Sequence, residues 1–204
     1  MPQAISEYVP QLVHDGESAR RWRRARRGWA AAVGLAALLL ALIVGAPLLK
    51  AGGMESAAGA AYGAFALVCH QMDERSFHLF GFKLAVCARC LGLYAGALVG
   101  ALAYPLARPL VRRDLPRPGW LLAAGVPTTV DFALGFFRVW ENTHASRFLT
   151  ASLVGVAVAF YFVPGVVDLA LTPRNQLFGR GRERRPKLPN FLPNEGVDGH
   201  ERQT

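Results

Sequence analysis

The sequence has few charged residues, few acidic residues and only three cysteines. Of its 204 residues 18% are charged, and 14 acidic residues stand against 23 basic ones, which gives a net charge of +9. A soluble domain of this length does not usually combine so basic a balance with 52% hydrophobic residues. This composition therefore argues against a soluble fold.

The basic residues are not arranged as in a nucleic-acid-binding protein. Such a protein, with a pI near 10.2, would spread Lys and Arg over a polar face with aromatic residues between them. Here the arginines flank long uncharged runs, as in the run RRWRRARRGW that precedes residues 30–49. We therefore expect no nucleic-acid partner and interpret the charge as a signal of membrane topology.

Four apolar stretches are long enough to cross a bilayer, because about 20 helical residues span a hydrocarbon core of about 30 Å. A fifth stretch, rich in Ala and Gly, has only about twelve residues and predicts an interfacial or re-entrant helix. We therefore expect an all-α integral membrane protein whose main partner is the lipid bilayer. The expected spans are residues 29–49, 84–106, 120–138 and 148–167, and the short helix covers residues 57–68.

The spans divide the chain into three parts. Residues 1–28 form a basic cytoplasmic segment, residues 29–168 the transmembrane domain, and residues 169–204 a basic tail that we expect to be disordered because it mixes charge, Pro and Gly. A cleaved signal peptide is the alternative interpretation of the first apolar run. An uncleaved anchor is favoured, because that run is long and no clear A-x-A site follows it.

The distribution of Lys and Arg predicts the orientation, since cytoplasmic loops collect these residues. With both termini cytoplasmic, the inner segments hold 17 of the 23 basic residues and the outer side holds six. We therefore expect a multi-pass membrane protein with both termini cytoplasmic. The cysteine-containing stretch then lies on the outer side.

Three glycines recur every four residues within the second span, at Gly92, Gly96 and Gly100. They lie along one stripe of the helix, where small residues let another helix approach closely. Glycine is also common in membrane helices in general. The stripe therefore predicts helix packing and carries no chemistry.

All three cysteines lie within residues 69–90. Cys87 and Cys90 are three positions apart at the start of the second span, so they face the same side of the helix. Cys69 and His70 could complete a tetrahedral set of three cysteines and one histidine, a frequent zinc site. Adjacent residues diverge in a regular helix, however, so His78 is the substitute if only one of that pair binds.

Two other chemistries remain open for these thiols. The outer side of a membrane is oxidising, and a CxxC pair at a helix start next to Arg89 favours a reactive thiolate, so a thiol-disulfide oxidoreductase using Cys87 and Cys90 is the main alternative. A purely structural disulfide with a spare thiol is the third interpretation. Leu91 stands where a histidine would follow CxxC in a c-type haem site, which argues against that cofactor.

Asp131 lies inside the third span, where an ionisable group is either paired or functional. Counted from the outer ends of their helices, Asp131 and Arg89 reach a similar depth of about 10 Å, which predicts an ion pair between them. The alternatives are a metal ligand or a proton carrier in a small transporter component. Glu141 and His144, in the last outer loop, are further candidates for the site, although loop charges are usually only solvated.

Several of these motifs resemble a known family. The runs CHQ at residues 69–71, ERSF at 74–77, VCARCLGLYAG at 86–96 and ENTHASRFLTASLVG at 141–155, with Pro127 and Asp131, are similar to the bacterial membrane proteins grouped as domain of unknown function 2085. The sequence departs from the usual pattern at Met72, Leu91 and Phe132, which affect helix entry and packing more than the thiols. The resemblance implies a small multi-span membrane protein, which we expect in the bacterial inner membrane, and no particular activity.

The sequence thus predicts a membrane protein with an extracytoplasmic Cys/His site that binds zinc or another transition metal. The predicted ligands are Cys69, His70, Cys87 and Cys90.

Overall fold

The computed structural model describes residues 3–112 and 114–172, with side chains from residue 16 onward. This part of the chain is mainly helical, as predicted. Its elements are α1 (Gln3–Ala51), α2 (Glu55–Ala66), a 3-10 turn η1 (Asp73–Arg75), β1 (His78–Leu79), β2 (Phe82–Lys83), α3 (Ala88–Ala107), α4 (Gly119–Phe136) and α5 (His144–Leu171). The tail predicted to be disordered lies outside the described residues from residue 173 onward, whereas residues 169–171 belong to α5.

Four of the described helices are long and apolar enough to cross a membrane, which confirms the predicted number of spans. They are the part of α1 from Gly16 to Ala51, and the whole of α3, α4 and α5. Because α2 has only 12 residues, it is too short to span, as its sequence predicted. Helix α1 differs from the expectation in one respect, since it continues upstream through the basic segment without a break.

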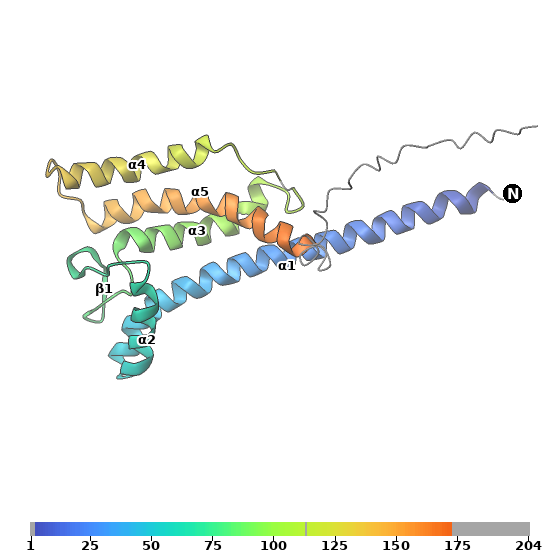
Figure 1. Ribbon diagram of the computed structural model, residues 1–204. Coiled ribbons are helices and arrows are strands. Elements are labelled where there is room, and N and C mark those ends of the chain that lie inside the picture. Colours follow the sequence, from blue (N-terminus) through green and yellow to red (C-terminus); the bar gives the residue numbers. More distant parts are fainter. Residues whose placement is uncertain (1–2, 113, 173–204) are drawn as a thin grey trace, which may run out of the picture. The chain divides into compact units, whose positions relative to one another are not determined.

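The spanning helices run in alternating directions, with α5 packed against α1, α3 and α4 (Figure 1). Helix α1 also contacts α3, and the Trp29 indole of α1 donates a hydrogen bond of 2.8 Å to the Ala101 carbonyl of α3. As a result, the end of α1 at Ala51 lies at the same end of the bundle as the start of α3 and the start of α5. The segment between α2 and α3 covers that end.

The predicted glycine stripe packs α3 directly against α5. A Cβ atom added at Gly92 or Gly96 would overlap the backbone carbonyl of Phe148 or Ser152, and one at Gly100 would lie 2.7 Å from the Val156 carbonyl oxygen. Larger residues at these positions would therefore hold the helices apart. The close approach fixes how the start of α3 lies against the start of α5.

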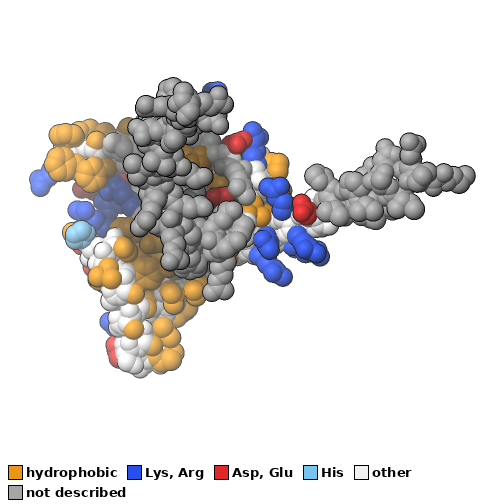
Figure 2. Space-filling model, turned by 45° about the vertical axis from the view of Figure 1, so that its right-hand side comes forward, with side chains coloured by type: hydrophobic (Ala, Val, Ile, Leu, Met, Phe, Trp, Pro, Cys, Tyr) orange, Lys and Arg blue, Asp and Glu red, His pale blue; other side chains and the backbone are white. Residues whose placement is uncertain are grey.

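Helix α4 has no buried residue, and much of its apolar surface is exposed. In a soluble monomer such a surface would be an interaction or aggregation site, whereas in a bilayer it faces lipid tails. Figure 2 shows hydrophobic side chains over large parts of the molecule, with Lys and Arg gathered along the exposed part of α1. The surface therefore agrees with a membrane protein.

A hydrophobic cluster supports the segment between α2 and α3. Ile43 of α1, Phe65 of α2 and Val86 before α3 are buried together with Cys69. The remainder of the cluster consists of Ala46, Leu84 and Ala85.

The short hairpin of β1 and β2 turns at Phe80 and Gly81, which both have positive φ, the conformation of a tight hairpin turn.

Candidate metal centre

The three cysteines form one group. Their sulfur atoms lie within 4.8 Å of one another, and the structure contains them as free thiols. Zinc bound to thiolates at about 2.3 Å holds its sulfurs about 3.8 Å apart in a tetrahedral site. The sulfurs therefore need to move by no more than about 1 Å to bind one ion.

Cys69 is buried at the end of the loop that follows α2. Its sulfur accepts hydrogen bonds from the backbone amides of Cys87, at 3.3 Å, and Gln71, at 3.5 Å. Gln71 has φ of 50°, an uncommon conformation for a residue with a side chain. Its side-chain amide donates to the Tyr62 carbonyl at 2.7 Å, which stabilises this turn. The two amides fix the position of the Cys69 sulfur beside the start of α3.

Cys87 immediately precedes α3, and Cys90 lies in its first turn. The pKa of the Cys87 thiol is lowered to about 5, mainly because the Cys90 thiol donates a hydrogen bond to its sulfur. The backbone amides of Cys90 and Arg89 and the Cys69 thiol lower this pKa further, whereas burial opposes the shift. The start of α3 therefore favours a thiolate at Cys87.

The histidines predicted as ligands lie apart from the sulfurs. The exposed His70 lines the same pocket as the three cysteines, but it is not part of the close group. The His78 ring is also exposed, and its Nε2 lies 3.4 Å from the Asp73 carboxylate. His144 begins α5 and packs against the Phe77 ring, while Glu141 is exposed beside a different pocket.

A small pocket of about 160 Å³ opens beside the sulfurs. Its wall contains the three cysteines, His70 and Gln71, together with three arginines: Arg75 from η1, Arg89 from α3 and Arg147 from α5. A ligand in this pocket would therefore meet sulfur on one side and guanidinium groups on the other.

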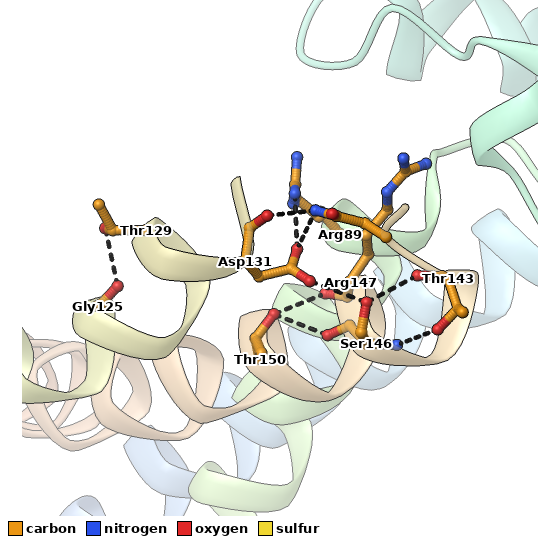
Figure 3. Close-up of polar contacts among 9 residues, drawn as sticks. Arg89, Gly125, Thr129, Asp131, Thr143, Ser146, Arg147 and Thr150 are labelled. Carbon is orange, nitrogen blue, oxygen red and sulfur yellow. Dashed lines mark hydrogen bonds and ion pairs between the residues drawn. The ribbon is translucent and has the colours of Figure 1, made fainter. Parts of the chain in front are cut away.

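The expected ion pair between Arg89 and Asp131 is present. Arg89 Nη2 donates to Asp131 Oδ2 at 2.7 Å, and Ser146 Oγ donates to the other carboxylate oxygen at 2.8 Å (Figure 3). The Asn142 amide donates to Oδ2 at 3.0 Å and to the Asp131 backbone carbonyl. Because these contacts use both carboxylate oxygens, they favour the structural interpretation of Asp131 over a metal ligand or a proton carrier.

Three residues that contribute to this end of the bundle were not among those predicted from the sequence. Gln71 shapes the turn at Cys69, and Ser146 and Asn142 complete the contacts of Asp131. A signal for the last two was available, since both lie in the polar stretch at residues 141–147, directly before the predicted span at residues 148–167. No local pattern indicated that Gln71 would adopt a positive φ.

The spans, the exposed apolar helices and the cysteine group define a multi-pass membrane protein with a compact thiol site near one end of its helices. The sequence profile of the family described as predicted membrane protein, DUF2085, matches residues 69–161. The chain belongs to this family, which confirms the resemblance found in its motifs. The matched residues include all three cysteines and most of α5.

Two relatives are similar to the chain. An uncharacterized protein of Methanocaldococcus jannaschii is 41% identical over 103 residues, which is 50% of this chain and 66% of that protein. An uncharacterized protein of Methanothermobacter thermautotrophicus is 31% identical over 95 residues, which is 47% of this chain and 84% of that protein. Both organisms are archaea. No solved structure matches the chain.

Proposed function

We propose that Cys69, Cys87 and Cys90 bind one transition-metal ion such as zinc through three thiolates. The observation that carries this proposal is the convergence of the three sulfur atoms, from two segments of chain, to within 4.8 Å of one another. Soft thiolate ligands select metals such as Zn²⁺ and Cu⁺. The amides that point at the Cys69 sulfur provide the outer hydrogen bonds that metal thiolates usually receive.

The small pocket lies beside the sulfurs, and His70 is the residue proposed to supply the fourth ligand. His70 lies in the pocket wall directly after Cys69, so rotation of its exposed side chain can bring a ring nitrogen toward the sulfurs. His78 is a weaker candidate because it lies beside Asp73. Glu141 and His144 have no contact that would make them ligands.

The proposed orientation places the thiol site outside the cell and both termini in the cytoplasm. The bias of 17 inner to six outer basic residues supports this orientation. The proposed membrane domain covers residues 29–168, between the basic segment 1–28 and the tail 169–204. The bacterial inner membrane remains a prediction, since both relatives are archaeal.

Elemental analysis of the purified full-length protein tests the metal proposal. We expect about one metal ion per chain, and we expect each single Cys→Ser variant to lose about as much metal as the triple variant, because a closed site needs every thiolate. Arg112→Gln, on the exposed loop between α3 and α4, is a control that should retain the metal. A Cys69→Ser variant with full metal content would contradict the proposal.

A thiol-disulfide oxidoreductase is the second candidate, favoured by the position of Cys87 directly before α3 and close to Cys90. In that reaction the two thiols form a disulfide, and two electrons and two protons pass to a quinone or to the disulfide of a partner protein. Replacement of one cysteine, as in Cys90→Ser, would then trap a mixed disulfide between Cys87 and the partner protein. A metal-free protein whose Cys87 and Cys90 cycle in this way would replace the first proposal.

A further inference from the structure

The pocket beside the sulfurs concentrates positive charge. Arg75, Arg89 and Arg147 come from three segments that are far apart in the sequence, yet each contributes to the wall of one pocket of about 160 Å³. Like charges at short range repel, so such an arrangement requires negative groups nearby. Whether the pocket needs a negatively charged ligand therefore depends on how many acidic side chains lie close to these three arginines.

Only one of the three arginines has a close acidic partner in the described part of the chain. Arg89 contacts Asp131 at 2.7 Å, and both side chains are largely buried. Arg75 Nε lies 3.9 Å from Glu74, but these side chains are 50% and 66% exposed, and a solvated pair at that distance contributes little. Two guanidinium groups are therefore left with weak compensation or none.

Arg147 carries the clearest sign of a missing partner. Within residues 16–112 and 114–172, no carboxylate lies within 4.0 Å of its guanidinium group. Its Nε is buried and has no hydrogen-bond acceptor, although buried donors are normally satisfied. Figure 3 shows the Arg147 side chain extending from α5 on the same side as Arg89, with no contact drawn from its guanidinium group. Among the described residues the Arg147 guanidinium group therefore has no close counter-charge, although it lines the pocket.

The excess of positive charge persists when the thiols hold a metal. Three thiolates around a divalent ion carry a single net negative charge, which offsets one of the two remaining guanidinium groups. The pocket therefore favours an anion both without a metal and with a divalent one. Anion binding is accordingly tested on the metal-free protein.

We propose that the pocket binds a phosphate group, held mainly by Arg147 and Arg75. Arginine forms paired hydrogen bonds with phosphate oxygens, and the charge of a phosphate matches two guanidinium groups better than that of a single carboxylate. The volume of about 160 Å³ is below the range of about 300–1,000 Å³ found for drug-sized ligands, so it suits a small group. Because the pocket lies where α3 and α5 begin, the phosphate can come from a free ion or from a lipid headgroup.

Calorimetric titration of the full-length protein in a maltoside detergent, which contains no phosphate, tests the proposal. The protein is first treated with a chelator and then titrated with inorganic phosphate in one arm and with short-chain phosphatidic acid in the other. Saturable binding of inorganic phosphate indicates the free ion. Binding of phosphatidic acid alone indicates a lipid headgroup.

Matched variants assign the binding to this pocket. We expect Arg147→Gln and Arg75→Gln each to weaken the affinity about tenfold or more, because each removes one charge-assisted pair. Arg138→Gln should leave the affinity unchanged, since Arg138 is exposed at the same end of the bundle but does not line this pocket. If Arg147→Gln does not fold, Arg75→Gln decides the result, because Arg75 is exposed on a turn. Failure of both probes to bind, or an equal loss in Arg138→Gln, would overturn the proposal.

Discussion

Arg89, in the first turn of α3, donates a hydrogen bond of 2.7 Å to Asp131, which lies well inside α4. Only 25% of the Arg89 side chain and 10% of the Asp131 side chain are exposed. Since α4 buries no residue of its own, this contact and the hydrogen bonds from Ser146 and Asn142 are the main polar attachments of the half of α4 that contains Asp131. The ion pair therefore helps to fix the position of α4 beside α3 and α5.

Breaking this pair from one side should destabilise the protein more than removing both partners. We expect Asp131→Ala to cost about 3–5 kcal/mol, because it leaves Arg89 uncompensated, whereas Asp131→Leu combined with Arg89→Met should cost much less. Thermal unfolding in detergent measures the difference, with Asp114→Ala as a control that breaks an exposed pair. Strictly additive losses in the double variant would show that the two side chains do not interact.

Gly96→Leu should separate α3 from α5. The added side chain would overlap the Ser152 backbone, which cannot move without moving the helix, so we expect a loss of about 1–3 kcal/mol or more. Gly125→Leu in α4 is the control, because nothing lies within 4 Å of an added Cβ at that position. Melting temperatures of the two variants provide the comparison. Equal stability would mean that the glycine stripe does not determine the packing.

The two candidate histidines should differ in their effect on metal affinity. His70→Ala should weaken the affinity about 10–100-fold, whereas His78→Ala should not change it, because His78 lies beside Asp73 instead of lining the pocket. Competition with a chelating indicator measures both affinities. An unaffected His70→Ala protein would indicate that the fourth position is filled from solution.

Reporter fusions and cysteine labelling should place the thiol site on the outer side of the membrane. In a variant with its native cysteines replaced, Arg75→Cys should react with a membrane-impermeant maleimide in intact cells, because Arg75 lies on an exposed turn. A cytoplasmic reporter fused to the C-terminus should be active in the same cells. Labelling of position 75 only after the cells are opened would reverse the proposed topology.

The sequence was sufficient to predict the spans and the grouping of the cysteines. Uncharged runs flanked by arginines leave few alternatives to membrane helices, and the Gly92 stripe predicted close packing that α5 satisfies. The proximity of Cys69 to Cys87 followed from their short separation and from the short helix before them. Depth counting along the helices also placed Arg89 correctly beside Asp131.

Other features depend on contacts that no local pattern encodes. The hairpin has strands of two residues, too short for any alternation to indicate them. The position of His70 depends on the backbone turn at Gln71, where φ is 50°. Arg147 reaches the pocket only because α5 packs closely on α3, so its proximity to Arg75 and Arg89 is a tertiary effect.

The residues that line the pocket are not all synthesised at the same stage. The three sulfurs belong to residues 69–90, so they can come together once α3 has formed, before α5 packs against it. Arg147, and the packing of His144 and Phe148 against Phe77, arrive only with the last helix. The pocket therefore gains the last of its three arginines only after the cysteines, Arg75 and Arg89 have been made.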